Sequence, residues 1–391
     1  MCVALWLYLL VAHGRFWIIP ALCNVETRSR TDGQGAGRPR TVAVVIPARN
    51  EAVVIGRAVA SLLRQSGFTL PPKAGEKDGA SDFSLQVFVV DDNSTDGTAD
   101  AARLAAHEFP GRVTVIPGRP LPAGWSGKLW AVQQGVEQAL AVEPDFLLLT
   151  DADIEHDSHN VASLIGIARD GSYDIVSYMV KLHCRSLAEK LLIPAFVFFF
   201  FLLYPPQWIR DSRRKTAGAA GGCLLIRPAA LERIGGIEAI RGEIIDDCAL
   251  ARAVKSTGGK VWLGATAATH SVRPYDSFAE IEKMIARTAF NQLRHSFWLL
   301  LGTIVGMLLI YLLPLAMMIS GSAKLALMGA AAFILMCGSY LPMVRFYGLS
   351  PLWALTLPFS AGFYTLATIH SALKYWSGQG GEWKGRAQDQ G

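Results

Sequence analysis

Short apolar runs alternate with amphipathic stretches through the first half of the chain. The apolar runs lie at residues 41–46, 85–90, 113–116 and 145–150. Runs of this length are typical of strands buried on both faces. The stretches between them repeat apolar residues at helical spacing, at residues 54–63, 99–106 and 128–140. This alternation predicts an α/β domain with a mostly parallel, Rossmann-like sheet and right-handed crossovers.

The second half is less regular until three long apolar segments begin. Before them we expect two strands, a short helix and a basic amphipathic helix, at residues 173–181, 221–226, 229–234 and 278–295. The three segments, residues 297–320, 325–344 and 349–369, are 24, 20 and 21 residues long and uncharged. Each is long enough to cross about 30 Å of hydrocarbon as a helix. The pattern therefore predicts three transmembrane helices within residues 297–375, with buried core helices as the alternative, and a polar tail at 376–391.

Two other apolar stretches are harder to interpret. Residues 1–23 form an N-terminal membrane segment that His13, Gly14 and Arg15 interrupt, so either a full span or a broken, interfacial helix is expected. A cleaved signal is disfavoured because no basic region precedes the apolar stretch. Residues 191–204 contain 14 apolar residues, five of them phenylalanine, and are too short to span. An interfacial or re-entrant helix over 191–209, or a buried helix of a soluble core, is expected there.

Composition and charge place this domain at a membrane. The apolar content is 51% and the mean hydropathy +0.30, and the excess lies after residue 296. Basic clusters at residues 28–40 and 210–215 flank the first two apolar stretches, which favours the cytoplasmic side of an inner, multi-pass membrane protein. No aromatic-interleaved basic module indicates nucleic-acid binding. The six cysteines have no paired spacing, so neither a zinc site nor a disulfide framework is expected.

The organisation along the chain follows from these patterns. Residues 24–40 are expected to be a linker, and residues 41–270 the catalytic domain. Residues 271–296 form an amphipathic region that leads into the spans.

Acidic residues follow two of the expected strands. Asp91 and Asp92 come after the run at 85–90, and Asp151 and Asp153 follow the run at 145–150. Ligands of an open parallel sheet bind outside the carboxyl ends of its strands, so these carboxylates are expected to face a ligand. Asp151 and Asp153 can hold Mg²⁺ or Mn²⁺ while the ion keeps positions open for phosphate oxygens. A solvated, helix-capping loop is the alternative reading of such a pair.

The neighbouring residues extend this chemistry to a nucleotide. Asp92 can accept a hydrogen bond from a uracil-like base, and Asn93, Ser94 and Thr95 can cap the following helix. Two consecutive acids at a strand end repel each other unless a bound group offsets their charge.

Two further positions carry candidate chemistry. Lys128, at the end of the loop 124–128, can offset diphosphate charge with help from a helix start. The spacing of this loop does not match a P-loop. Asp246 and Asp247 precede a stretch of helical periodicity, so one of them can act as general base and the other can cap the helix.

The order of these motifs resembles that of family 2 glycosyltransferases of the GT-A fold over residues 41–296. The matching segments are Pro47-Ala48-Arg49-Asn50-Glu51, Asp91-Asp92-Asn93-Ser94-Thr95-Asp96-Gly97-Thr98, Gly124-Trp125-Ser126-Gly127-Lys128, Thr150-Asp151-Ala152-Asp153 and Asp246-Asp247-x-x-Leu250. Five motifs in order are more specific than any one of them.

The resemblance implies inverting transfer from a nucleotide sugar, a UDP-sugar, to a lipid hydroxyl. It implies that Asp92 binds the base and that Asp151 and Asp153 hold metal and diphosphate. Asp247 matches the second acid of the family's Glu-Asp motif and is the implied base, while Asp246 replaces the usual Glu. Pro47, Arg49, Glu51 and Lys128 are the other implied donor-binding residues.

Further likenesses concern the acceptor. The loop 124–128 and the C-terminal spans look like those of the lipid-acting branch, which includes ceramide and carotenoid glycosyltransferases. Residues 193–196 and 271–278 look most like hopanoid-associated glycosyltransferases, which implies a polycyclic or polyisoprenoid acceptor. Related processive and ceramide enzymes carry Gln-x-x-Arg-Trp, where the corresponding stretch of this chain is Asn291-Gln292-Leu293-Arg294-His295. Arg294 is implied to lie near the phosphates, and the loss of Trp at His295 argues against a polysaccharide channel.

Three alternatives differ in class from a lipid glycosyltransferase. A processive polysaccharide synthase-like enzyme would share the motifs. A catalytically silent membrane scaffold would keep the fold, although the intact Asp92, Asp151, Asp153 and Asp247 speak against it. A nucleotidyltransferase would show a glycine-rich basic loop after the first strand, and residues 47–51 contain no glycine.

Overall fold

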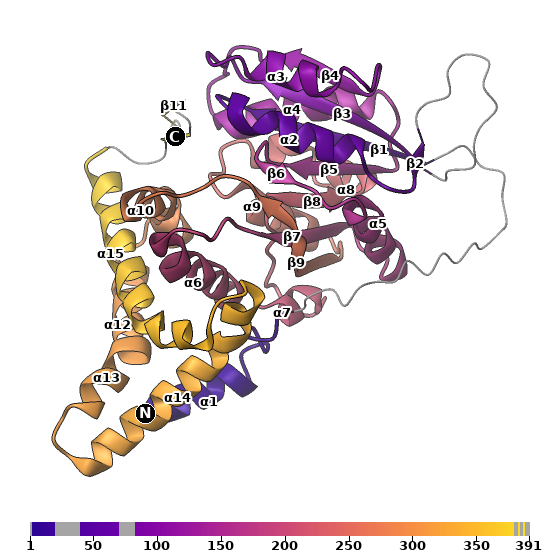
Figure 1. The fold of residues 1–391 in the computed structure, drawn as a ribbon. Coiled ribbons are helices and arrows are strands. Elements are labelled where there is room, and N and C mark those ends of the chain that lie inside the picture. The colour runs from indigo at the N-terminus through magenta and orange to yellow at the C-terminus, as the bar shows by residue number, and fades with distance from the viewer. Residues whose placement is uncertain (1, 20–39, 70–82, 379–381, 384–385, 388–391) are drawn as a thin grey trace. The chain divides into compact units, whose positions relative to one another are not determined.

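The computed structural model describes residues 2–19, 40–69 and 83–378, and the backbone of residues 382–383 and 386–387. Most of the expected linker at 24–40 and of the tail at 376–391 lies outside the described residues. The chain forms two compact units (Figure 1). The α/β unit comprises residues 21–181, 212–273 and 383–391, and the helical unit comprises residues 1–20, 182–211 and 274–382.

A mostly parallel sheet forms the centre of the α/β unit. Its strands are β1 (Arg40–Ala48), β2 (Phe68–Thr69), β3 (Phe83–Asp91), β4 (Val113–Pro117), β5 (Phe146–Thr150), β6 (Ile154–Glu155), β7 (Ile175–Lys181), β8 (Cys223–Ile226) and β9 (Val261–Ser271). They lie in the order β2-β3-β1-β5-β8-β7-β9-β6, with β4 also beside β3. Strand β8 is antiparallel to both of its neighbours and β6 is antiparallel to β9, while the other described pairs are parallel.

Helices cover this sheet and set the position of its strand ends. They are α2 (Ala52–Leu63), α3 (Thr98–Ala105), α4 (Gly127–Leu140), α5 (Asn160–Asp170), α8 (Pro228–Arg233), η1 (Ile237–Ile240) and α9 (Asp246–Ser256). Residues 42–46 of β1 are fully buried, as expected for a β-branched run at the centre of a sheet. Helix α4 packs on β1 and β3, and Gly135 permits its close approach because a Cβ there would overlap the side chain of Val45.

The helical unit contains the long apolar helices. Its elements are α1 (Cys2–Val11), α6 (Leu187–Leu203), α7 (Pro206–Arg210), α10 (Phe278–Ala286), α11 (Ala289–Gln292), α12 (Phe297–Met307), the π turn η2 (Leu308–Leu312), α13 (Leu313–Met318), α14 (Ala323–Phe346), η3 (Pro351–Thr356) and α15 (Leu357–Trp376). By length and composition, four stretches of the described residues could cross a membrane: Leu187–Arg210, Phe297–Met318, Ala323–Phe346 and Pro351–Trp376.

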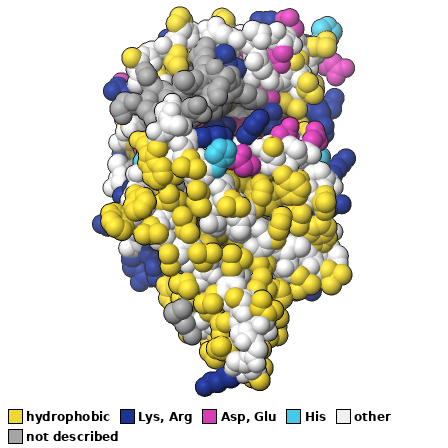
Figure 2. Space-filling view, turned by 90° about the vertical axis from the view of Figure 1, so that its left-hand side faces the viewer, with side chains coloured by type: hydrophobic (Ala, Val, Ile, Leu, Met, Phe, Trp, Pro, Cys, Tyr) yellow, Lys and Arg dark blue, Asp and Glu magenta, His cyan; other side chains and the backbone are white. Residues whose placement is uncertain are grey.

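The surface of the helical unit agrees with a membrane environment. Hydrophobic side chains cover the face of these helices shown in Figure 2. Trp298, Ile319 and Leu327 are 75%, 86% and 73% exposed. Only 17% of the most apolar part of Phe297–Met318 is buried within the chain. Exposed apolar area of this extent is typical of a lipid- or partner-facing surface, so the helices suggest a membrane protein.

Two of the expected helices differ from the structure. The single helix expected at 278–295 is wrong, because α10 ends at Ala286 and α11 begins at Ala289. In an unbroken helix the N–H of Phe290 would donate to the carbonyl of Ala286. Instead, Ser371 Oγ donates to Ala286 O (2.5 Å) and accepts from Phe290 N (3.1 Å), so a side chain from α15 occupies the gap. The segment at 297–320 is also not one regular helix, because the π turn η2 precedes Pro314, which lacks an N–H.

The two ambiguous apolar stretches are also helical. Helix α1 has 10 residues, about 15 Å, so a single-helix span does not form within residues 2–19. The stretch at 191–204, expected to be too short to span, lies within the 24 helical residues Leu187–Arg210, because α7 extends α6. In its most apolar part, 56% is buried within the chain. Whether it lies in the membrane interface stays a prediction.

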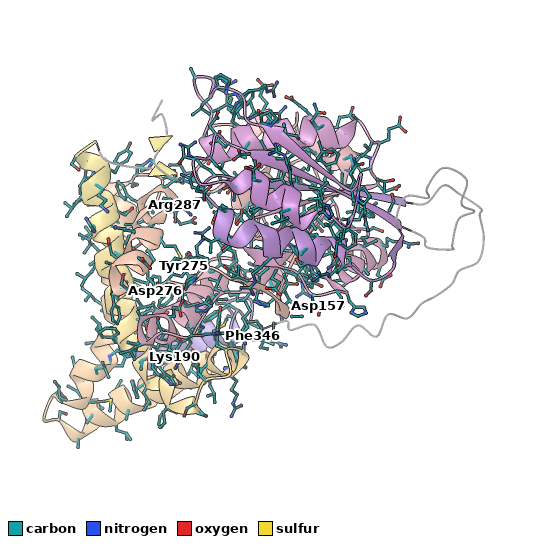
Figure 3. All side chains as sticks on the ribbon, turned by 45° about the horizontal axis from the view of Figure 1, so that its top comes forward. Asp157, Lys190, Tyr275, Asp276, Arg287 and Phe346 are labelled. Atoms are coloured by element: carbon teal, nitrogen blue, oxygen red, sulfur yellow. The ribbon has the colours of Figure 1, made fainter. Side chains whose placement is uncertain are left out.

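A buried carboxylate fixes the start of α6. Glu189, fully buried, accepts hydrogen bonds from the backbone N–H groups of Arg185, Ser186 and Tyr275 (2.7–2.8 Å) and contacts His183 Nδ1 at 2.6 Å. Ser186 completes a capping box with Glu189. Tyr275 and Asp276 lead from here into α10 (Figure 3).

Candidate active site

The ends of β1 and β3 are joined through Asp92. Its side chain is fully buried, and its backbone N–H donates to Ala48 O (2.8 Å). Arg49, directly after β1, donates from Nη1 to Asp92 O (2.6 Å) and lies 3.6 Å from Asp92 Oδ2. The predicted donor residues Arg49 and Asp92 are therefore in contact at one sheet edge.

The loop after Asp92 does not cap the following helix as expected. Asn50 Oδ1 accepts from Thr95 N (2.9 Å), and Ser94 Oγ accepts from Asn50 N (3.0 Å). Asp96 instead accepts from the backbone N–H groups of Ala52 and Thr98 (3.0 and 3.1 Å). The prediction that Asn93, Ser94 and Thr95 cap the helix is wrong, because Asn50 of the neighbouring strand end takes up Ser94 and Thr95.

Arg273 bridges two of the predicted acids. Its Nη2 contacts both carboxylate oxygens of Glu51, and its Nε lies 3.4 Å from Asp153 Oδ2. Ser271 Oγ also donates to Asp153 Oδ2 (2.7 Å). Burial raises the pKa of Asp153, the nearby charge of Asp151 raises it further, and Arg273 opposes both. Glu51 is 9% exposed, and its ion pair with Arg273 holds it in place.

Lys128 connects the two other acidic motifs. Its Nζ lies 3.0 Å from Asp151 Oδ1 and 3.1 Å from Asp246 Oδ2. Burial alone would lower the pKa of Lys128, but Asp151, Asp246 and Asp247 raise it above its ordinary value. Lys128 lies in the first turn of α4, whose N-cap Ser126 accepts from Leu129 N. The cation is therefore held between two carboxylates, and its role toward a diphosphate stays a prediction.

Asp247 differs from its neighbour in its partners. Its Oδ2 accepts from Gly221 N and its Oδ1 from Cys248 N, both at 2.7 Å. Burial raises the pKa of Asp247 to about 6, with a further contribution from Asp246, while Lys128 acts in the opposite direction. Neither acid is the N-cap, since Ile245 holds that position in α9.

One pocket brings together five of the predicted residues. Pro47, Lys128, Asp151, Asp246 and Asp247 line it together with Gly221 and an apolar floor. The floor consists of Leu129, Val132, Leu149, Leu224, Ile237, Ile240 and Leu250. Low polarity beneath the acids strengthens the electrostatic interactions within the pocket.

Arg294 and His295 belong to the helical unit. They follow α11 with positive φ angles of 52° and 54°, and the ring of His295 stacks on Tyr375 at 3.9 Å. Their position near a phosphate stays a prediction.

The donor set fits a divalent cation in part. Within the described residues, no three His, Cys, Asp or Glu side chains are arranged to hold a metal. Burial, and after it the nearby charge of Asp151, raises the pKa of Asp153, so a cation between the two carboxylates would offset their repulsion. Asp151 Oδ2 and Asp153 Oδ1 make no hydrogen bond with any of the residues that the structure describes. Two oxygens are therefore available to an ion that completes its coordination with phosphate and water.

Sequence reasoning missed the supporting residues. Arg273 was noted only as part of a resemblance, and Ser271 had no assigned role. Thr150, which lines the pocket and belongs to a matching motif, and the buried His156 had no assigned role either. The one signal in the sequence was a basic residue, Arg273, close to the end of an apolar stretch. Its partner Glu51 lies 222 positions away, so the pairing could not be seen without the fold.

Comparison with known proteins identifies the family. A family model described as "Glycosyltransferase like family 2" matches residues 39–291, well over half of the chain. The mannosyltransferase PcManGT from Pyrobaculum calidifontis, in complex with GDP-Man and Mn²⁺, is 18% identical, with 96% of this chain and 99% of that chain covered and a TM-score of 0.50. TarS from S. aureus is 14% identical, with 84% and 55% covered and a TM-score of 0.41. Mannosyl-3-phosphoglycerate synthase from Rubrobacter xylanophilus is 17% identical, with 63% and 70% covered and a TM-score of 0.35.

At such low identities a structural likeness is evidence for the fold alone. Of these three structures, only the first, with a TM-score of 0.50, is similar enough to support it. Together with the family match, this likeness confirms the expected GT-A fold with a mostly parallel sheet. On the extent of the family match, this chain belongs to glycosyltransferase family 2.

Proposed function

We propose that this protein transfers a sugar, with inversion, from a nucleotide-sugar donor to the hydroxyl of a membrane lipid. The observation that carries the proposal is the pocket in which Asp247, with a pKa raised to about 6, lies beside Lys128 and Asp151. A base and charge-neutralising groups within one pocket suit attack by an alcohol and departure of a diphosphate.

Asp247 takes the proton of the attacking hydroxyl. A pKa near 6 leaves the carboxylate ionised at neutral pH and makes it a better proton acceptor than an ordinary aspartate. Lys128, which contacts Asp151 and Asp246, also offsets negative charge on the diphosphate. Asp246, which holds Lys128, is a positioning residue in this scheme.

The other predicted residues bind the donor. Asp92 accepts a hydrogen bond from the nucleobase of the donor, and Arg49 holds the backbone of Asp92 in place. Pro47 forms part of the pocket wall, and Glu51 acts through Arg273. Mg²⁺ or Mn²⁺ on Asp151 and Asp153 would neutralise charge on the leaving diphosphate. The GDP-Man and Mn²⁺ in the complex of the mannosyltransferase support a nucleotide sugar and a divalent ion, and a UDP-sugar is the donor proposed here.

The apolar helices support the acceptor and the location proposed here. A polycyclic or polyisoprenoid lipid, with a role in hopanoid metabolism, fits the candidate spans and the resemblance at residues 193–196 and 271–278. We place the protein in the inner membrane with its catalytic domain in the cytoplasm, and the amphipathic region 271–296 at the headgroups. Arg294 and His295 are assigned to the phosphate and acceptor region. The domain boundaries and three C-terminal spans expected from the sequence are part of this proposal.

Lipid mass spectrometry tests the proposal. Membranes of cells that make the wild type, Asp247→Asn or the matched control Asp100→Asn are scanned for lipids with added hexose, pentose or amino-sugar mass. Asp100 is an exposed residue of α3, so its variant should behave as wild type. We expect a glycosylated lipid with the wild type and the control only.

Purified protein with UDP- and GDP-sugars then identifies the donor. If all three proteins are present in the membrane and give identical lipid profiles, transfer to a lipid through Asp247 is excluded. A scaffold without transfer activity would then be favoured.

A further inference from the structure

We propose that residues 219–222 form a fixed backbone support for Asp247, and that Thr150, Ser177 and His156 are positioning residues for the transfer reaction. We name residues 219–222 the base-support segment. The inference rests on the proposed role of Asp247. It assigns a function to three buried polar side chains. Of these, only Thr150 lines the pocket.

The base-support segment gives Asp247 one of its two hydrogen bonds. Gly221 N donates to Asp247 Oδ2 at 2.7 Å. A Cβ at Gly221 would lie 3.3 Å from Asp247 Oδ2 and 3.5 Å from Lys128 Nζ, so glycine permits this close approach. The direction of Asp247 Oδ2 is therefore set by the backbone at Gly221.

Buried side chains from two strands hold the residues on either side of Gly221. Ser177 Oγ, on β7, donates to Ala220 O (3.0 Å) and accepts from Ala220 N (2.8 Å). Thr150 Oγ1, at the end of β5, donates to Gly222 O (2.7 Å). Ser177 and Thr150 are 0% and 1% exposed, so water does not compete for these bonds. Ser177 therefore fixes the peptide group that joins Ala220 to Gly221, and Thr150 fixes the one that follows Gly222.

A third contact reaches the segment from the helix that carries the base. Cys248 Sγ lies 3.5 Å from Ala219 O, within the range of a weak S–H hydrogen bond. The neighbour of Asp247 on α9 therefore contacts the same segment that binds Asp247.

His156 completes the support behind Thr150. Its Nε2 lies 3.0 Å from Thr150 Oγ1, and Asn160 Nδ2 lies 2.9 Å from its Nδ1. Because the Thr150 hydroxyl donates its hydrogen to Gly222 O, it must accept from His156, which places the ring proton on Nε2. Nδ1 then accepts from the Asn160 amide. Burial also lowers the pKa of His156 to about 3, so the ring is neutral and keeps this tautomer.

Ser177 binds Ala220 O, which shares a peptide group with the Gly221 N–H, and the chain His156–Thr150–Gly222 fixes the other end of the segment. Together they hold the Gly221 N–H toward Asp247. A shift of about 1 Å in a reacting group can reduce a rate by about a hundredfold. We expect Thr150→Val, which keeps the shape and removes the hydroxyl, to lower kcat by about ten- to a hundredfold. The dissociation constant of the donor should stay within about twofold of wild type, because Thr150 contributes no charge to diphosphate binding.

The experiment compares variants of the full chain in detergent or lipid. Thr150→Val and Ser177→Ala remove one hydroxyl each, and Thr150→Ser restores the hydroxyl without the methyl group. Thr269→Val is the matched control, since Thr269 is fully buried and its hydroxyl accepts from Asp157 N instead. The measurements are kcat and KM for the donor, donor affinity by calorimetry, and thermal melting.

Amide hydrogen exchange of the peptide that contains residues 219–222 gives a readout independent of activity. We expect faster exchange there in Thr150→Val and Ser177→Ala, and near wild-type exchange and kcat in Thr150→Ser and Thr269→Val. Unchanged exchange in both hydroxyl-deleted variants would overturn the support, whether or not the wild type is active. Faster exchange with unchanged kcat would overturn the positioning role. A wild type that binds donor but makes no product refutes the proposed function separately.

Discussion

The acid limb of the pH–rate profile tests the assignment of Asp247 most directly. Burial, and then the charge of Asp246, raise the pKa of Asp247 to about 6, and Lys128 partly offsets this. A base works in its ionised form. Because the raised pKa means that the folded protein binds this proton more tightly, activity should be lost as the pH falls through about 6.

The size of the loss follows from the ionised fraction. With a pKa of about 6, about half of Asp247 is ionised at pH 6 and about one tenth at pH 5. The ratio kcat/KM should therefore fall about tenfold per pH unit below that point. An aspartate with the ordinary pKa of 3.8 would keep over about nine tenths of its activity at pH 5.

Two variants should move the limb in opposite directions. Asp246→Asn removes a repelling charge, so the limb should move to lower pH. Lys128→Met removes an attracting charge, so the limb should move to higher pH, together with a lower maximal rate. Initial rates with saturating acceptor, measured between about pH 4.5 and 8, give kcat/KM for the donor. Asp100→Asn serves as the control for loss of a surface charge.

A flat profile down to about pH 5 in the wild type would refute the reasoning. So would a limb that neither variant moves, because the charges assigned to the pKa would then have no effect on it.

Three further outcomes are expected. Arg273→Gln should lower stability by about 2–4 kcal/mol in thermal melting, because the carboxylates of Glu51 and Asp153 lose a shared cation; an unchanged melting curve would exclude the bridge. Asp153→Asn should weaken Mn²⁺ binding in the presence of UDP by about tenfold or more, measured by calorimetry against Asp100→Asn; equal affinities would remove Asp153 from the metal site. Glu189→Gln should cost about 2–3 kcal/mol in melting, because a neutral amide replaces a buried carboxylate with several donors; a cost near zero would contradict that role.

The strand ends of the site were predictable because burial on both faces leaves a clear pattern. The runs at 41–46, 85–90 and 145–150 became β1, β3 and β5, and the acids after them lie at one edge of the sheet. Strand β9 was missed, since Gly264 and its alanines have low β propensity and the strand forms through pairing with β7. Propensity is a weak guide where tertiary pairing decides the structure.

Errors arose where a distant residue competes for a local hydrogen bond. Ser371 interrupts the expected helix at 278–295, and Asn50 takes up the residues expected to cap α3. In each case the local sequence is compatible with the predicted bond, and the competing partner lies tens of positions away. Such competition cannot be seen in a window of the sequence.

The two adjacent aspartates show how environment separates residues of one type. The residues alone offered Asp246 and Asp247 as base and cap without deciding between them, and only the family resemblance implied Asp247 as the base. In the structure, Asp246 binds Lys128, whereas Asp247 receives two backbone hydrogen bonds in a pocket with an apolar floor, where burial raises its pKa. Two carboxylates whose environments differ in this way can take different roles in acid–base chemistry. Because the two side chains are chemically identical, the distinction comes from burial and from their different partners, Lys128 for Asp246 and Gly221 for Asp247.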